Sequence, residues 1–287
     1  MTGMEALVST ILKKRVLIPG RVTEMILDAP EIAVKAKPGN FVILRVAEDG
    51  ERFPLTIADA DAGKGTITIV YLVLGKSTAM LDTLGEGDAV LDLCGPLGRA
   101  TDIRKVGTVI CVGGGTGIAA MHHIAKGHAQ AGNKVVSIIG ARSADLLLFE
   151  EELSKFSHEV LIATDDGSKG QKGFVTQVLK ERLESDPDVK EVVAVGPVPM
   201  MRAVAEVTRP FGVKTVVSLN SIMVDGIGMC GACRVRVDDS IRFACVDGPE
   251  FDAHKVDFGE LMMRLGSYVP QEKQSYKCYC ECHGKES

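Results

Sequence analysis

A glycine-rich loop between an apolar segment and a helix-like segment restricts the fold of this 287-residue chain more than any other feature. Val106–Val112 predicts a buried strand, and Ile118–Ala131 predicts a helix. The pattern G-x-G-x-x-A joins them, and its small residues let a tight turn bring backbone N–H groups against a pyrophosphate at the helix N-terminus. The loop therefore predicts a dinucleotide-binding unit, with an ordinary glycine turn as the alternative. Its residues are Gly113, Gly114, Gly115, Thr116 and Gly117.

Strands and helices alternate around this loop. Val135–Ile139 and Val192–Val195 are predicted strands, whereas Leu146–Phe156 and Met200–Thr208 are predicted helices. Such alternation indicates parallel strands that are joined by helical crossovers. We therefore expect a doubly wound α/β domain over residues 100–218.

Two further turns follow strands of this sheet and are expected to face the same crevice. The second strand ends in Gly140-Ala141-Arg142, where an acidic residue usually binds a ribose hydroxyl. Because an arginine there can accept a 2′-phosphate instead, the residues leave NAD and NADP both open. A later strand ends at Gly196-Pro197 and contributes the other turn.

The first hundred residues show a different pattern of short strands separated by turns. Phe41–Val46, Thr66–Tyr71 and Ala89–Leu93 are β-branched or apolar runs bounded by glycine-containing turns. Only Ser77–Leu84 reads as a short helix. This regular strand spacing predicts an antiparallel barrel or sandwich over residues 1–99.

The eight cysteines are unevenly placed, and three of them lie between residues 230 and 245. Cys230, Cys233 and Cys245 match the C-x₂-C…C part of a plant-type [2Fe–2S] ligand set, and Asp225 stands where the remaining ligand is expected. A carboxylate can bind iron as a harder oxygen donor. The alternative is a structural zinc site completed from the tail. We expect a small metal module over residues 219–287.

The other five cysteines have no assigned chemistry. Cys94 and Cys111 lie in apolar runs and are predicted to be small core residues. Cys278, Cys280 and Cys282 are expected in a mobile or partner-docked tail.

Composition and charge exclude several classes of protein. The formal net charge of −5 argues against a nucleic-acid-binding surface. The longest weakly polar run, residues 106–121, is shorter than a spanning helix and contains five glycines, so no membrane segment is expected. Residues 1–19 contain no long apolar stretch, which argues against a secretory signal. We expect a soluble, cytoplasmic protein.

The order of barrel, nucleotide domain and cysteine module resembles the ferredoxin-NADP reductase superfamily, in its members with a C-terminal [2Fe–2S] domain. Residues 217–260 carry the resemblance. An aspartate as first ligand is similar to the small subunits of NADH-dependent reduced ferredoxin:NADP oxidoreductases. The electron-transfer subunits of dihydroorotate dehydrogenase have four cysteines instead.

The resemblance implies FAD on the barrel. Thr56 would lie near the flavin ring, and aligning on it leaves Arg52 one place out of register with the superfamily's arginine. An ordinary barrel strand and helix cap are the alternative. The candidate residues are Arg52, Phe53, Pro54, Leu55, Thr56, Val70, Tyr71, Leu72, Gly75, Lys76, Ser77 and Thr78.

The resemblance also implies further nucleotide contacts. Asp165 and Asp166 would bind ribose hydroxyls, although a solvated acidic turn is the alternative. Met200 is a candidate contact whose ordinary role would be helix packing. The histidines that follow the glycine loop are expected on the surface, without a catalytic role. They are His122, His123 and His128.

These features together predict an electron relay with no catalytic side chain. NAD(H) would exchange a hydride with FAD, and single electrons would pass through the [2Fe–2S] cluster. By resemblance, the partner is a large flavin and iron–sulfur subunit that handles NADP(H) and ferredoxin in an electron-bifurcating transhydrogenase. The alternatives are a dihydroorotate dehydrogenase subunit and a zinc-binding module without a redox role.

Overall fold

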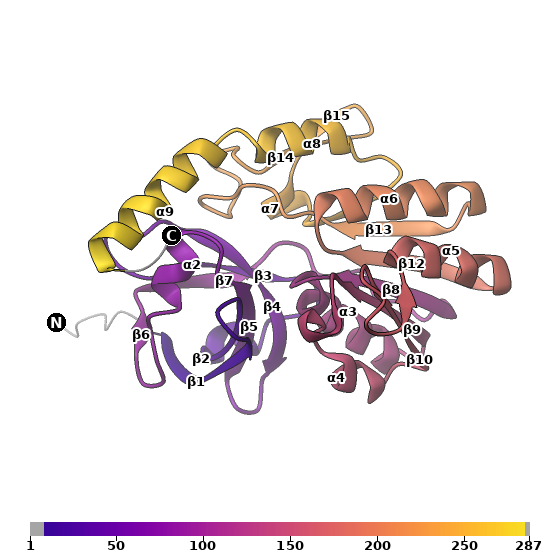
Figure 1. Cartoon of the computed structure of the whole chain (residues 1–287), viewed down its shortest axis with the longest axis horizontal. Helices are drawn as coiled ribbons and strands as arrows, with labels where there is room; N and C mark the ends of the chain where they lie inside the picture. The colour runs from indigo at the N-terminus through magenta and orange to yellow at the C-terminus, as the bar shows by residue number, and fades with distance from the viewer. Residues whose placement is uncertain (1–8, 285–287) are drawn as a thin grey trace.

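Residues 9–97 form a seven-stranded antiparallel sheet that curls into a nearly closed barrel in the computed structural model, which describes residues 9–284 (Figure 1). Alternate side chains such as Met25 and Leu27 point into the barrel core, as the two-residue period of a strand requires. The strands, in the order β6-β1-β2-β5-β4-β3-β7, are β1 (Ser9–Ile18), β2 (Val22–Asp28), β3 (Phe41–Arg45), β4 (Phe53–Asp61), β5 (Thr66–Leu72), β6 (Ala89–Val90) and β7 (Asp92–Leu97).

Two details of the barrel differ from the prediction. The strand expected over Ala89–Leu93 is divided, so that β6 and β7 form the two ends of the sheet. The expected short helix begins one residue earlier, as α2 (Lys76–Leu81), and a second short helix, α1 (Pro30–Ala33), follows β2. The predicted barrel architecture is confirmed.

Within residues 108–252, a second seven-stranded sheet is parallel except at one edge. Its central strand β8 leads into the glycine loop. Strands β9, β10 and β11 follow on one side of β8, and β12 and β13 follow on the other, so the strand order reverses between β8 and β12 as in a doubly wound fold. The predicted α/β architecture is confirmed. In the order β11-β10-β9-β8-β12-β13-β16, the strands are β8 (Thr108–Gly114), β9 (Lys134–Ala141), β10 (Glu159–Thr164), β11 (Gln171–Lys172), β12 (Val189–Val195), β13 (Lys214–Ser218) and β16 (Glu250–Asp252).

Helices cover both faces of this sheet because its strands are apolar on both sides. One face packs against α3 (Gly117–Gln130) and α4 (Glu150–Ser154), and the other against α5 (Val175–Ser185) and α6 (Val198–Thr208). The helix predicted over Leu146–Phe156 is shorter than expected. It is preceded by a 3₁₀ turn, η1 (Ala144–Leu146), and a left-handed Phe149 stands at the start of α4. A second 3₁₀ turn, η2 (Arg209–Phe211), follows α6.

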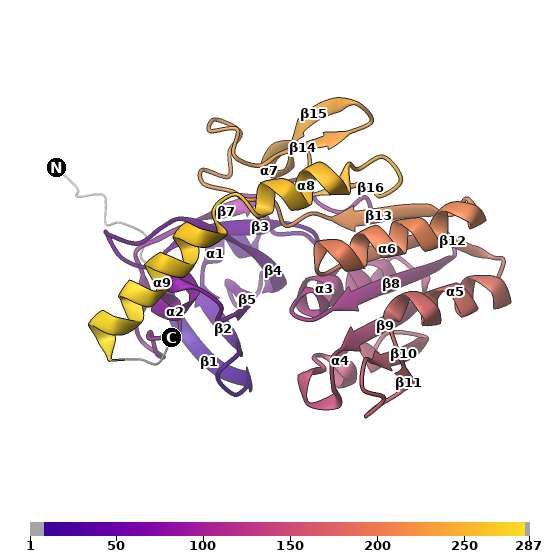
Figure 2. The same ribbon diagram turned by 45° about the horizontal axis from the view of Figure 1, so that its top comes forward.

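The C-terminal module does not stand apart from the nucleotide sheet. Its third strand, β16, pairs antiparallel with β13 and so extends that sheet. The remaining elements lie above α6 in Figure 2, where α8 crosses near the β-hairpin. They are β14 (Arg234–Val237), β15 (Ser240–Phe243), α7 (Ala244–Asp247) and α8 (Phe258–Leu265).

The cysteine-bearing tail forms a helix, α9 (Val269–His283), that returns over the barrel and lies on α2 (Figures 1 and 2). Cys280 is 1% exposed and packs with Tyr279 against Ala79 of α2. The expectation of a mobile or partner-docked tail is therefore wrong for the described residues, because this segment docks on its own barrel. Among the described helices, none is long and apolar enough to cross a membrane.

The two isolated cysteines have different environments. Cys111 is fully buried in β8, as predicted. Cys94 is exposed in β7, so its predicted core position is wrong. Strand β7 lies at an edge of the barrel sheet and its other residues are only half-buried, which the local apolar run does not reveal.

Glu250 lies where the barrel, the nucleotide sheet and the C-terminal module meet. Its carboxylate accepts a hydrogen bond from the Thr101 hydroxyl at 2.6 Å, and the backbone of Gly39 approaches both groups. Burial raises the pKa of Glu250 to about 7, and the neighbouring Glu191 acts in the same direction. The carboxyl that joins these three parts of the chain is therefore protonated below about pH 7 and ionises above it.

Replacing this carboxyl with an amide tests that assignment. In the unfolded chain the Glu250 carboxyl loses its proton above its ordinary pKa, whereas in the folded chain it keeps the proton up to about pH 7. The unfolding free energy of the wild type therefore falls as the pH rises from the ordinary pKa of a glutamate to about 7. We expect Glu250→Gln to gain about 2 kcal/mol in unfolding free energy relative to wild type between pH 5 and pH 8. Urea unfolding at both pH values measures this. A pH-independent difference would contradict the assignment.

Candidate functional site

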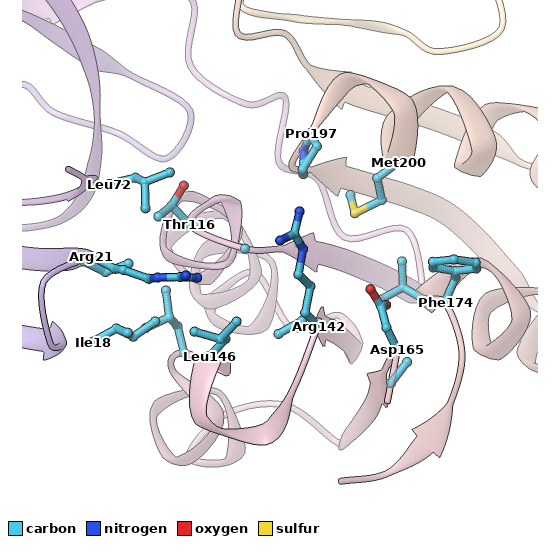
Figure 3. A pocket seen from close by; sticks show the side chains of 18 of the residues that line it. Ile18, Arg21, Leu72, Thr116, Arg142, Leu146, Asp165, Phe174, Pro197 and Met200 are labelled. Carbon is cyan, nitrogen blue, oxygen red and sulfur yellow. The ribbon is translucent and has the colours of Figure 1, made fainter. Parts of the chain in front are cut away.

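A cleft of about 390 Å³ opens between the tip of the β1–β2 hairpin and the carboxyl ends of β8, β9 and β10 (Figure 3). The carboxyl ends of parallel strands are where doubly wound folds bind ligands. Most of the predicted nucleotide residues meet here. Those that line the cleft are Gly114, Gly115, Thr116, Gly140, Ala141, Arg142, Asp165, Pro197 and Met200.

Close backbone packing explains why this loop needs glycines. A Cβ on Gly117 would lie 2.5 Å from the Val195 carbonyl oxygen and 2.7 Å from Cα of Gly196, so α3 touches the end of β12 directly. A Cβ on Gly140 would lie 2.3 Å from Val175 Cγ1. Gly115 has φ +56° and open space beside it, which leaves the ligand side of the turn free.

The remaining predicted nucleotide residues lie outside this cleft. Gly113 is buried at the end of β8 beside Met121. Asp166 lies in an exposed turn, where hydrogen bonds from Ser168 lower the pKa of its carboxyl. Asp165 is thus the acidic residue of this pair that lines the cleft.

A second cleft, of about 560 Å³, lies between the barrel and the glycine loop. Its walls are mainly apolar, and its volume falls within the usual range for small-molecule sites. Seven of the predicted flavin residues line it: Pro54, Leu55, Thr56, Val70, Tyr71, Leu72 and Thr78. Gly117 and Gly196 line this cleft and not the first one.

The polar groups around this cleft test whether a flavin suits it. Ser221 is 5% exposed, and its Oγ has no hydrogen-bond partner among residues 9–284. Because a buried hydroxyl without a partner is costly, a polar ring system in the cleft would satisfy it. Tyr71 contributes its ring only, since its hydroxyl donates to Asp82 at 3.1 Å, and burial raises its pKa.

Five predicted flavin residues do not line the cleft. Arg52 forms an ion pair with Asp92 at 3.2 Å. Lys76 and Ser77 both contact Glu51, by an ion pair and a hydrogen bond respectively. The complete set outside the cleft is Arg52, Phe53, Gly75, Lys76 and Ser77.

The two clefts are adjacent. Both are lined by Leu72 of the barrel and by Thr116 and Pro197 of the nucleotide domain, together with two loop glycines. Ligands in the two clefts would therefore meet beside the glycine loop. This arrangement suits hydride transfer, which requires the reacting atoms to be in contact.

Helix α3 holds the barrel against this loop. Nδ1 of His123 donates to the Ile57 carbonyl at 2.9 Å, one residue beyond Thr56, and Lys126 pairs with Asp59 at 2.9 Å. His122 packs between two phenylalanine rings. The expectation of surface histidines is wrong, because His122, His123 and His128 are all buried, and burial lowers each pKa.

The predicted metal ligands lie in one loop region, but their side chains do not all converge on one point. Sγ of Cys233 lies 3.1 Å from Sγ of Cys245, and both residues are buried. Asp225 lies beside exposed Cys230 and accepts hydrogen bonds from the backbone N–H groups of Ile227 at 2.8 Å and Cys230 at 2.5 Å. Within the part of the chain that is described, no three metal-binding side chains converge.

The chemistry of this loop fits a cluster bound by sulfur. Backbone N–H groups of Ala232 and Cys245 point at cysteine sulfurs at 3.5 Å, as around cluster ligands. Burial raises the pKa of the Cys245 thiol to about 12, so binding a metal would need to displace its proton. Gly226, with φ +74°, lies against Ile43 and brings the loop onto the barrel.

Two family models match parts of the chain. Residues 220–257 match the iron–sulfur cluster binding domain of dihydroorotate dehydrogenase B, and residues 111–206 match the oxidoreductase NAD-binding domain. The C-terminal module is therefore an iron–sulfur cluster binding domain, which favours iron over the zinc alternative. The α/β domain is an NAD-binding domain.

Full-length relatives extend this result. A Thermotoga maritima protein named dihydroorotate dehydrogenase B (NAD(+)), electron transfer subunit homolog, is 45% identical over 272 residues, covering 95% of this chain and 96% of its own. The electron transfer subunit of Fusobacterium nucleatum is 36% identical over 77% of this chain and 86% of its own. The chain belongs to the ferredoxin reductase-like electron-transfer subunits.

Solved structures agree with this family. A structure of NADH-dependent reduced ferredoxin-NADP oxidoreductase, solved to study flavin-based electron bifurcation, superposes with a TM-score of 0.89 at 43% identity, covering 97% of this chain and 99% of that one. A ferredoxin NADP+ reductase from Neisseria gonorrhoeae shares the fold alone, with a TM-score of 0.58 and 17% identity over 71% of this chain and 92% of its own.

Sequence reasoning missed several residues of this electron-transfer subunit that line or support the clefts. Arg21 and His123 belong to no recognisable motif, and Ser221 lies in the segment that carries the resemblance but has no predicted role. The turn Pro19-Gly20 is a detectable signal for a hairpin tip near Arg21, but nothing in the sequence places that tip over the glycine loop. These positions depend on how the barrel and the sheet pack together.

Substituting Gly117 tests the close contact between α3 and β12. The added Cβ of Gly117→Ala would overlap the backbone of β12, so we expect a loss of about 2 kcal/mol in unfolding free energy and weaker NADH binding. Gly259→Ala in α8 is the matched control, because its Cβ would meet only a side-chain oxygen at 3.3 Å and leave stability unchanged or slightly higher. Equal stability of both variants in urea unfolding would disprove the contact.

Proposed function

We propose that the chain is an electron relay subunit that exchanges a hydride with NAD(H) and passes single electrons through FAD and a [2Fe–2S] cluster to a larger partner. The observation that carries this proposal is the junction of the two clefts beside the glycine loop. A bound flavin supplies the exchange between two-electron and one-electron chemistry. The protein positions the ligands of the two clefts, donates hydrogen bonds to them and excludes water from around them.

The nucleotide cleft has the groups that a dinucleotide needs. Gly114, Gly115 and Thr116 present backbone at the N-terminus of α3, where a pyrophosphate is stabilised. Asp165 suits a ribose hydroxyl, and Met200 packs over Gly114 and Gly196 to close that side. Asp166 and Gly113, which were also predicted, have structural partners and are left out of this assignment.

The flavin cleft holds a ring between the barrel and the loop. Thr56 and Ser221 lie on its walls and offer hydroxyls to ring heteroatoms, while Leu55 and Tyr71 contribute apolar surface. His123 fixes the Ile57 carbonyl and thereby holds the strand that carries Thr56. Arg52, Lys76 and Ser77 remain candidate FAD contacts that would have to exchange their present partners.

The cluster loop is a continuation of the flavin cleft. Ser218 to Ser221 line that cleft, and the chain reaches Asp225 four residues later. Asp225, Cys230, Cys233 and Cys245 are the proposed ligands. This short connection supports electron transfer between the two centres.

Exposed apolar side chains surround the cluster loop and support a partner subunit. Val224 is 50%, Ile227 51% and Met229 82% exposed. Clustered apolar surface of this kind commonly marks a protein interface. The partner that we propose is a large flavin and iron–sulfur subunit that binds NADP(H) and ferredoxin, in a bifurcating transhydrogenase.

A second candidate is the electron-transfer subunit of dihydroorotate dehydrogenase B, the name carried by the Fusobacterium relative. Asp225 favours the transhydrogenase, because the resemblance to its small subunit includes an aspartate ligand. Purification of the complex from its source distinguishes the two. A partner that oxidises dihydroorotate, instead of one that reacts with NADPH and ferredoxin, would overturn our choice.

Metal content and colour test the relay itself. Purified anaerobically, the chain should show flavin absorption together with sulfur-to-iron charge-transfer bands, and about two irons per chain. A colourless protein that contains zinc would contradict the proposal and support the non-redox binding module.

The role of Asp225 can be tested separately. Asp225→Cys should retain the cluster but shift its absorption and lower its reduction potential, because a thiolate donates more charge to iron than a carboxylate does. Asp247→Asn is the matched control, since this nearby carboxylate accepts from the Phe243 N–H and pairs with Arg99. An unchanged spectrum and potential in Asp225→Cys would show that Asp225 is not a ligand.

A further inference from the structure

Arg21 belongs to the barrel but projects into the nucleotide cleft. Its backbone is fixed on both sides, because its N–H donates to the Ile18 carbonyl at 3.0 Å and its carbonyl accepts from the Val73 N–H at 2.7 Å. The β1–β2 hairpin therefore presents this side chain from a rigid tip. Figure 3 shows Arg21 entering the cleft from the barrel and Arg142 rising into it from the end of β9 toward Pro197.

Neither guanidinium has a hydrogen-bond or ion-pair partner within residues 9–284, although most arginines of the described chain do. Apart from Thr116 and Asp165, the other lining residues are apolar or glycine, and Asp165 is the one carboxylate among the described lining residues. Two unpaired cations facing one cleft leave an excess of positive charge. A guanidinium fork matches the oxygens of a phosphate, which would supply the missing negative charge.

We propose that Arg21 and Arg142 bind phosphate groups of one dinucleotide from different walls of the cleft, so that the nucleotide bridges the barrel and the NAD-binding domain. This inference rests on the proposed nucleotide function of the cleft and adds a barrel residue to it. The phosphates are either the pyrophosphate or a ribose 2′-phosphate. In both cases the bound nucleotide ties the hairpin tip to the end of β9, beside the junction of the two clefts.

Binding of nicotinamide-free fragments tests the bridge without hydride transfer. The probes are ADP-ribose, which carries only the pyrophosphate, and 2′-phospho-ADP-ribose, which carries both groups. Isothermal titration of the full, cofactor-loaded chain should show that Arg21→Gln weakens binding about ten-fold or more, and Arg21→Lys should restore part of it. An equal loss for both probes identifies the pyrophosphate, whereas a loss confined to the second identifies the 2′-phosphate.

Arg104→Gln is the matched control, because Arg104 is an exposed arginine outside both clefts. Its variant should bind both probes as the wild type does. If the wild type binds ADP-ribose and Arg21→Gln binds both probes as tightly as the wild type does, the proposed bridge is wrong, whereas the proposed nucleotide function stands. If the wild type binds neither probe, the proposed nucleotide function fails and the bridge fails with it.

Discussion

The contact between helix α3 and barrel strand β4 is the constraint on which the rest of the site depends. Nδ1 of His123 binds the Ile57 carbonyl, and Lys126 pairs with Asp59, so the glycine loop at the start of α3 faces Thr56. The partly exposed ion pair contributes little stability on its own, roughly 1 kcal/mol at most. The buried histidine has the larger structural role, because losing it would leave a buried carbonyl unpaired.

The sequence predicted the parts of the molecule that depend on local chemistry. The strand, the glycine loop and α3 follow from a turn that only small residues can form, as the contact between Gly117 and Val195 shows. The barrel follows from the two-residue period of its strands. The spacing of Cys230, Cys233 and Cys245 predicted a cluster-binding module, and the family match agrees with it.

The parts that were not predicted depend on contacts between distant segments. Helix α9 is polar in composition, and only the apolar surface of α2 explains why Cys280 is buried there. The histidines of α3 are buried by three different contacts, because His123 meets the barrel, His122 packs on Phe149 and Phe156, and His128 lies beside Asn133. The local sequence does not predict contacts with segments so far away. Arg21 likewise lines the nucleotide cleft only because the barrel packs against the nucleotide domain. Motifs thus predicted which elements form, whereas packing determined which side chains meet.

The most direct test of the relay is the order in which the two redox centres are reduced by NADH. The cofactor-loaded chain is mixed anaerobically with NADH, flavin absorption is followed by stopped flow, and the reduced cluster is followed by electron paramagnetic resonance after rapid freezing. The account predicts that flavin absorption is lost first, that the cluster signal follows, and that flavin-depleted protein gives no cluster signal. A cluster that NADH reduces without flavin, or that stays oxidised beside fully reduced flavin, would contradict it.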